Sequence, residues 1–219
     1  MRAISYHVAP PCGPFHVAGA YRRAINLLFE GGEMVCLVIP EVGNGPGAIV
    51  VTSLSPRLPL LEGARPWAPP APPPLAPRAR LAAALRACQG LARPAPAALA
   101  AGDWAGAAGA LAGLGPGLTP AGDDVLAGCC VALHRAGHRF ATAFGAQLSS
   151  VPAEATTPLS HHLLKWAARG VAGEKHLAWL DALLVGRPAD PAPVLACGAT
   201  SGADWIAGAL AALEHFVLV

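Results

Sequence analysis

Residues 114–128 read Leu114-Gly115-Pro116-Gly117-Leu118-Thr119-Pro120-Ala121-Gly122-Asp123-Asp124-Val125-Leu126-Ala127-Gly128, a glycine-rich loop that leads into a helix. Thr119 is a suitable N-cap, because its hydroxyl can accept a hydrogen bond from a first-turn N–H. Pro120 suits the first helical position, where an N–H has no intrahelical partner. Gly122 lies inside the helix, although glycine there costs about 1 kcal/mol relative to alanine. This glycine therefore predicts that another group approaches the backbone closely.

The pattern returns near the C-terminus, where residues 198–208 read Gly198-Ala199-Thr200-Ser201-Gly202-Ala203-Asp204-Trp205-Ile206-Ala207-Gly208. Aligned on Gly122 and Gly202, both stretches read Gly-x-Asp-x-(Leu/Ile)-Ala-Gly. Asp124 then shares a helix face with small residues, and so does Asp204. Two helices with such faces can pack closely and bring their N-termini to one place.

Helix N-termini bind anions, and an aspartate beside them can hold a cation or accept a proton. Helix capping and the helix dipole also explain each residue taken alone, but the repetition favours a functional site. The candidate catalytic residues are Asp123, Asp124 and Asp204, and Asp124 is favoured over Asp123 because it matches Asp204 in helical spacing. The candidate substrate- or anion-binding residues are Gly115, Gly117, Thr119, Gly122, Thr156, Thr157, Ser160, Thr200, Ser201 and Gly202.

The central motif resembles the signature of a bacterial family, once known only as a domain of unknown function, that is similar to the AllH-type subunit of oxamate carbamoyltransferase. Further stretches support the resemblance over most of the chain: Arg23-Ala24-Ile25-Asn26-Leu27, Gly43-Asn44-Gly45-Pro46, Thr156-Thr157 with Ser160, and Thr200-Ser201-Gly202. The resemblance implies a transferase subunit in purine or allantoin nitrogen catabolism. It would move a carbamoyl group between an oxalurate-like ureide and phosphate, with partner subunits.

Composition places limits on class and compartment. The chain has 219 residues, of which 54% are hydrophobic and only 13% are charged. No apolar run approaches the roughly 20 residues that cross a bilayer, and the N-terminus lacks the pattern of a signal peptide. The six cysteines form no Cys-x-x-Cys pair and are interpreted as reduced packing residues. We expect a cytoplasmic protein that binds neither membrane nor nucleic acid, and the low surface charge is compatible with a homo-oligomer.

The order of strand-like and helix-like segments predicts an α+β fold. Residues 1–56 form a β-rich region of hairpins, a small sheet or barrel, with strands at 3–8, 16–20, 23–29, 34–39 and 48–52. Residues 57–77 form a proline-rich connector, since Pro66-Trp67-Ala68-Pro69-Pro70-Ala71-Pro72-Pro73-Pro74 excludes helix and central strand. Residues 78–219 form a bundle of about seven helices, predicted at 78–92, 97–114 (one or two), 119–136, 138–148, 157–169, 173–185 and 200–217, with 190–196 as a connector.

Three functions fit these patterns. The first is the carbamoyl transferase subunit. The second is a non-catalytic subunit that binds a small carboxylate or phosphate or acts as a scaffold; it is favoured by the lack of a histidine, lysine or cysteine beside the central motif. The third and weakest is a metal-dependent hydrolase, in which the aspartates would hold Mg²⁺. His161-His162 lacks the i, i+3 or i+4 spacing of helical metal ligands, so we predict no metal ligands and no certain cofactor.

Overall fold

The computed structural model describes residues 1–91 and 96–218. It divides the chain into two compact units, Met1–Pro70 and Ala71–Val219. The division falls inside the proline-rich stretch that the sequence predicts as a connector. The first unit is a sheet and the second is helical, so the predicted α+β class is confirmed.

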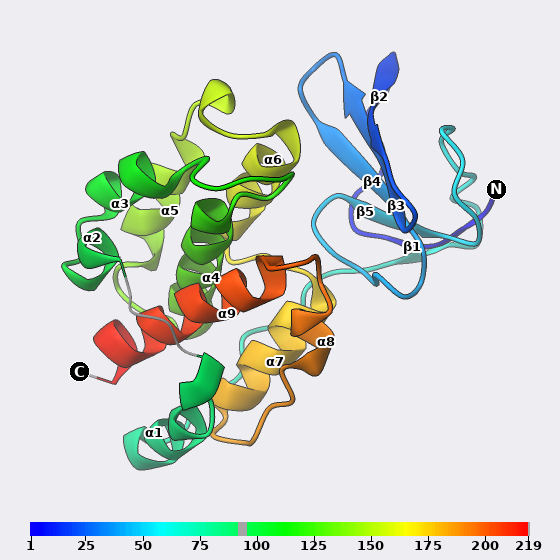
Figure 1. Cartoon of the computed structure of the whole chain (residues 1–219). Helices are drawn as coiled ribbons and strands as arrows, with labels where there is room; N and C mark the ends of the chain where they lie inside the picture. Colours follow the sequence, from blue (N-terminus) through cyan, green and yellow to red (C-terminus); the bar gives the residue numbers. More distant parts are fainter. Residues whose placement is uncertain (92–95, 219) are drawn as a thin grey trace. The chain divides into compact units, whose positions relative to one another are not determined.

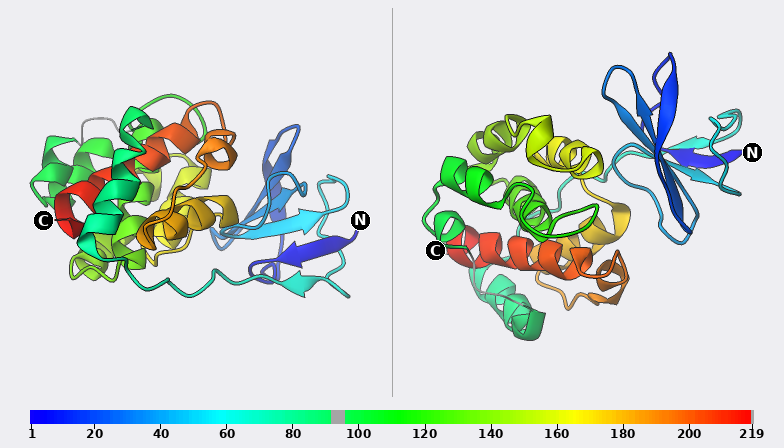
Figure 2. Two further views of the ribbon diagram at one scale, coloured as in Figure 1. Left: turned by 90° about the horizontal axis from the view of Figure 1, so that it is seen from below. Right: turned by 45° about the horizontal axis from the view of Figure 1, so that its top comes forward.

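The N-terminal unit is a six-stranded mixed sheet with the strand order β2-β3-β4-β5-β1-β6. Its strands are β1 (Ala3–Tyr6), β2 (Phe15–Ala20), β3 (Ala24–Phe29), β4 (Met34–Val38), β5 (Ala48–Val51) and β6 (Arg65–Pro66). β2, β3 and β4 form antiparallel hairpins, while β4 and β5 are parallel. The edge strands β2 and β6 do not pair with each other, so the sheet is open. Of the predicted alternatives, the structure is therefore a sheet and not a barrel. Figure 2 shows its twist, which follows from the right-handed twist of each strand.

Branched and aromatic residues explain these strands, because such side chains favour a pleated, half-buried backbone. One face forms a core around Leu27, Leu37, Ile49 and Val51. The parallel pair β4 and β5 is joined by a short connection, residues 39–47, in which Gly43 and Gly47 have positive φ. Glycine adopts that conformation at no steric cost, and this allows the chain to turn back without a helix.

The helical unit holds, in the part of the chain that the structure describes, nine α-helices, seven of them at least eight residues long. They are α1 (Arg78–Arg86), α2 (Ala97–Ala100), α3 (Trp104–Leu111), α4 (Ala121–Arg135), α5 (Ala141–Ser149), α6 (Pro158–Ala167), α7 (Glu174–Leu184), α8 (Ala192–Leu195) and α9 (Ser201–Ala212). A π-helical turn, Leu213–Val217, extends α9. The predicted bundle of about seven helices is therefore confirmed.

Several predicted helix boundaries are corrected. The connector predicted at 190–196 contains the short helix α8. The first helix was predicted to run to Ala92 but α1 ends at Arg86; Ala92 itself lies outside the described residues. Thr119 is not the N-cap of α4: Pro120 occupies that position and Ala121 begins the helix. The hydroxyl of Thr119 instead bonds to another helix, and a loop carbonyl takes over the capping, as described below.

Helix α4 is the centre of this unit and packs against α3, α5, α6 and α9 (Figure 1). Most of its residues are buried, because it is apolar or small on nearly every side. At its C-terminal end the guanidinium of Arg135 binds the carboxylate of Asp181 on α7 in a two-pronged ion pair, with Nε–Oδ1 and Nη2–Oδ2 distances of 2.8 and 2.5 Å. The N-terminal end of α4 carries the candidate site.

Candidate functional site

The N-termini of α4, α6 and α9 meet, as the repeated motif and the three threonine-bearing starts predicted. The Thr119 hydroxyl lies 2.6 Å from the Ser201 hydroxyl and so joins the α4 loop to α9. The Thr157 hydroxyl donates to the carbonyl of Leu118 at 2.5 Å and also accepts the N–H of Ser160, capping α6 as predicted. We call this region the α4–α6–α9 site: Thr119, Asp123, Asp124, Thr156, Thr157, Ser160, Ser201 and Asp204.

The two repeated helices cross with their backbones in contact. A Cβ atom added to Gly128 of α4 would overlap the carbonyl oxygen of Trp205, and one added to Gly208 of α9 would overlap that of Val125. Glycine at both positions is what lets helices approach this closely. The final glycine of each repeat therefore sets the distance between the two helices.

The first glycine of each repeat has a similar role. A Cβ on Gly122 would overlap the carbonyl oxygen of Leu111 in α3, and a Cβ on Gly202 would overlap that of Val194 in α8. The close approach to the backbone that Gly122 predicted is thus made by the preceding helix. Both glycines are explained by packing, without a ligand.

Asp123 is buried and its carboxyl group is fully engaged. Its Oδ1 accepts the N–H of Gly113 at 2.9 Å, and its Oδ2 accepts the hydroxyls of Thr156 and, at 2.7 Å, Ser160. It therefore fastens the loop before α4 to the start of α6. Gly113 was not among the predicted site residues. The signal that could have identified it is the alternation of Gly113, Gly115 and Gly117, all of which have positive φ.

We expect Asp123→Ala to lower the free energy of unfolding by about 3 kcal/mol, because it leaves three donors without this acceptor, the buried Ser160 hydroxyl and two that are half-buried. Asp123→Asn should cost about 1 kcal/mol, since the amide oxygen can still accept the Gly113 N–H and the hydroxyls can reorient. Urea unfolding of the two variants measures both values. Equal costs for Ala and Asn would contradict this role of the carboxyl oxygens.

Asp124 differs from its neighbour. Its side chain is 9% exposed, and its Oδ2 is buried without a hydrogen-bond partner. Burial raises its pKa to about 8, although hydrogen bonds from Ser201 and Thr119 act in the opposite direction. The charges of Asp204 and Asp123 act in the same direction as burial, and the value of about 8 is the net result of all these effects. Asp124 therefore presents a largely neutral carboxyl group with one oxygen unused.

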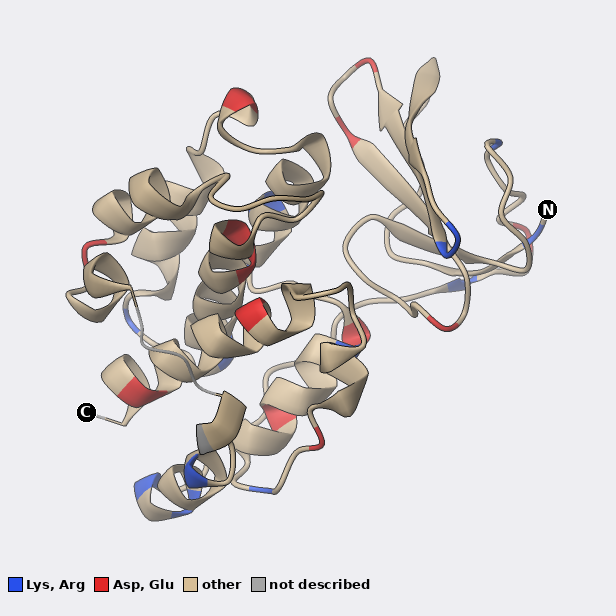
Figure 3. Ribbon diagram, viewed as in Figure 1, with Lys and Arg blue, Asp and Glu red and all other residues tan. Residues whose placement is uncertain are grey.

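Acidic residues occupy the first turns of both repeated helices: Asp123 and Asp124 on α4, and Asp204 on α9 (Figure 3). Asp123 and Asp204 are 1% and 3% exposed. Burial is the largest cause of the raised pKa of Asp124, and the charges of Asp204 and Asp123 add to it.

The backbone donors at these N-termini are largely used within the protein. The N–H groups of Gly122, Asp123 and Asp124 donate to the carbonyls of Leu114 and Pro120 at 2.9 to 3.1 Å. On α9, the N–H of Gly202 donates to Cys197 and that of Asp204 to Thr200, both at 3.0 Å. These five donors are not directed at a ligand, so an anion bound here would need others.

The remaining predicted residues lie at the edge of the site. Gly115 and Gly117 belong to an exposed loop, residues 114–118, that leads into α4. Thr200 is exposed and occupies the N-cap position of α9, where a threonine start was predicted, but its side chain makes no capping hydrogen bond. The loop carries two exposed leucines, Leu114 and Leu118, which sequence inspection did not single out.

No metal site was found within residues 1–91 and 96–218, where no three His, Cys, Asp or Glu side chains are grouped so as to hold an ion. His161 has a structural contact instead, with its Nε2 3.1 Å from the carbonyl oxygen of Val151. The ring of His162 packs against Trp166. Among the helices described, none is long and apolar enough to cross a membrane.

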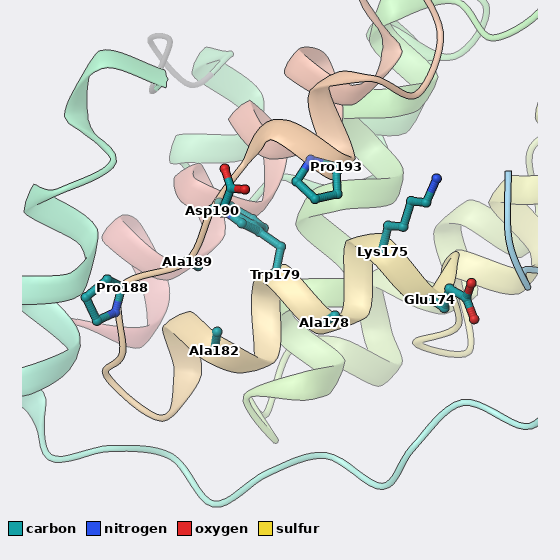
Figure 4. A pocket seen from close by; sticks show the side chains of 9 residues that line it. All are labelled: Glu174, Lys175, Ala178, Trp179, Ala182, Pro188, Ala189, Asp190 and Pro193. Carbon is teal, nitrogen blue, oxygen red and sulfur yellow. The ribbon is translucent and has the colours of Figure 1, made fainter. Parts of the chain in front are cut away.

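A cavity of about 540 Å³ lies between α7 and residues 188–193 (Figure 4). Its lining is mainly apolar, with Trp179 as the largest side chain and with Glu174, Lys175 and Asp190 as the charged ones. It contains none of the predicted site residues. The candidate residues predicted from the sequence therefore lie outside this depression.

Comparison with protein families places a match on the helical unit. Residues 111–213 match the family model described as oxamate carbamoyltransferase subunit AllH. This confirms the predicted resemblance over that segment, whereas Arg23–Leu27 and Gly43–Pro46 lie outside it. Neither the curated proteins nor the solved structures gave a match.

Proposed function

We propose, from the similarity of residues 111–213 to the oxamate carbamoyltransferase subunit AllH, that this chain is a subunit of a carbamoyl-transfer enzyme. It would act with partner subunits on an oxamate- or oxalurate-like ureide and phosphate. The similarity supports a substrate role for the α4–α6–α9 site, because the matched segment contains all of its residues. The observation that carries the proposal is the buried Oδ2 of Asp124, which has no partner within the protein.

The reaction would exchange one bond to the carbamoyl carbon for another. A phosphate oxygen attacks the carbamoyl carbon of the oxalurate-like ureide, the carbon–nitrogen bond breaks, and the released nitrogen takes a proton. The products are carbamoyl phosphate and oxamate. Acyl transfers of this kind are accelerated by groups that are already oriented toward the developing charge. The Thr119 and Ser201 hydroxyls and the carboxyl of Asp124 are the candidates for that role.

The substrate would lie with its two ends in different surroundings. Its carbamoyl end would enter between α4 and α9, beside Asp124 and Asp204. Its carboxylate, or the phosphate, would lie toward Gly115 and Gly117, where the exposed loop leaves room for an anion and a Cβ on Gly117 would meet nothing within 4 Å. Asp123 would position the loop through Gly113 rather than touch the substrate.

One observation favours the second candidate, a subunit that binds the substrate but does not catalyse alone. Among the described residues, the side chains that shift the pKa of Asp124 are two carboxyls and two hydroxyls. No amine, imidazole or thiol is among them. A subunit with this site would hold the ligand while a partner subunit supplies the cationic groups that phosphate needs.

Thermal unfolding of the full chain with oxalurate, oxamate, carbamoyl phosphate or phosphate tests the proposal. A ligand at 100 times its dissociation constant should stabilise the chain by about 3 kcal/mol. The effect should be lost in Asp204→Asn and kept in Glu214→Gln, which changes an exposed carboxyl in the π-helical turn after α9. Detection of carbamoyl phosphate by ³¹P NMR separates catalysis from binding alone. A cooperative melt that none of the four ligands shifts would contradict the proposal.

A further inference from the structure

The α4–α6–α9 site contains one buried carboxyl oxygen to which the described residues provide no partner, the Oδ2 of Asp124. The N–H groups of Gly122, Asp123, Asp124, Gly202 and Asp204 are consumed by backbone carbonyls. Three carboxyl groups are buried in the same region. An anionic group placed beside Asp124 would meet another oxygen acceptor and backbone N–H groups that are already engaged, whereas a ligand that brings its own N–H group would satisfy Oδ2.

The Oδ2 atom of Asp124 is the acceptor that such a ligand would satisfy. This atom is buried and unpartnered, and leaving such an oxygen unsatisfied costs about 1 to 3 kcal/mol. Burial, and after it the charges of Asp204 and Asp123, raise the pKa of this carboxyl to about 8 against the hydrogen bonds of Ser201 and Thr119. An acceptor oxygen without a partner is complementary to an N–H group, and a primary amide brings two of them. A carboxylate brings none.

The surrounding hydroxyls fix the position of that carboxyl group. Thr119 and Ser201 are bonded to each other at 2.6 Å, and both hydrogen-bond the Asp124 side chain. The two hydroxyls come from the loop that leads into α4 and from the start of α9. Oδ2 has no partner, so it is the carboxyl oxygen that a ligand would contact.

We infer that Asp124 is the residue that selects the primary amide end of the substrate, –C(=O)NH₂, by accepting a hydrogen bond from the amide N–H at its Oδ2. This inference rests on the proposed function. In this arrangement the neutral amide end of the ligand lies beside Asp124, and the anionic end lies toward the exposed loop. Oxamate, oxalurate and carbamoyl phosphate all carry this amide group, whereas oxalate has the shape of oxamate with a carboxylate in its place.

Calorimetric titration of the full chain with oxamate and oxalate tests the inference. The wild-type chain should bind oxamate at least tenfold more tightly than oxalate. Asp124→Asn keeps an acceptor oxygen and should stay within about threefold of wild type. Asp124→Leu has no acceptor and should lose at least tenfold in oxamate affinity. Circular dichroism of each variant confirms that it is folded.

Equal binding of oxamate and oxalate, with Asp124→Leu unaffected, would overturn the amide inference and leave the carbamoyl-transfer proposal standing. A second pair of ligands, acetamide and acetate, tests amide recognition without a ureide. Their binding is measured by the change in the ¹³C chemical shift of the Asp124 carboxyl carbon. A shift with acetamide alone would support the inference even if neither oxamate nor oxalurate binds, in which case only the proposed function fails. A carboxyl carbon that responds to none of the amides would overturn the inference.

Discussion

Gly128→Ala is expected to lower the free energy of unfolding by about 3 kcal/mol or more, because overpacked cores cost 1–3 kcal/mol and here both obstacles are backbone. The new Cβ would overlap the carbonyl oxygen of Trp205 and lie 3.1 Å from the nitrogen of Ala209. Neither can turn aside as a side chain can, so α4 and α9 must separate. The gain in helix propensity, about 1 kcal/mol, does not offset this cost.

Gly109→Ala is the matched control, since Gly109 is exposed on α3 and a Cβ there would meet nothing within 4 Å. It should stabilise the chain by about 0.5 to 1 kcal/mol, as expected when alanine replaces glycine in a helix. Guanidinium unfolding of the two variants measures the contrast. Similar unfolding midpoints for both would show that the helix contact does not depend on the glycine.

Asp124→Asn is expected to make the chain more stable than wild type at pH 8 and above, by several kcal/mol, since each pKa unit is worth about 1.4 kcal/mol. The pKa of the carboxyl is near 3.8 when unfolded and is raised to about 8 in the folded chain. The folded state therefore holds the proton more tightly, and stability falls as pH rises from about 4 to about 8. Asparagine resembles the protonated acid and carries no such penalty.

Urea unfolding at pH 5, 7 and 9 measures this effect as a difference between wild type and variant. The difference should be small at pH 5, grow through pH 7 and be largest at pH 9. Glu62→Gln, which changes an exposed carboxyl of the sheet unit, should leave the pH dependence parallel to that of wild type. A constant difference for Asp124→Asn across the three pH values would show that the carboxyl ionises normally.

Much of the fold could be predicted because its determinants are local. The apolar runs and glycine turns predicted β3, β4 and β5 within one or two residues of their observed bounds. The repeated Gly-x-Asp-x-(Leu/Ile)-Ala-Gly pattern predicted that α4 and α9 pack closely, because small residues on one face allow two helix backbones to come into contact. The parallel pairing of β4 with β5 was not predicted, because strand direction depends on how a short connection turns.

The site was only partly predictable for a related reason. Spacing on a helix distinguished Asp124 from Asp123, and the structure gives them different surroundings: Asp123 accepts three hydrogen bonds while Asp124 keeps a free oxygen. The role of Thr119 could not be read from its neighbours. Its hydroxyl bonds Ser201, 82 residues away, instead of capping its own helix. Long-range partners of this kind leave no trace in local sequence.

The backbone contact between α4 and α9 limits how this site can change during evolution. Where Gly128 and Gly208 meet the facing carbonyls, no side chain lies between the helices, so the spacing between Asp124 and Asp204 is set by atoms common to every residue. The distance between α4 and α9 is therefore fixed at this point, and changes of side-chain rotamer cannot alter it. Adaptation to longer or bulkier substrates would therefore accumulate in residues 114–118, where the backbone is exposed and free to lengthen.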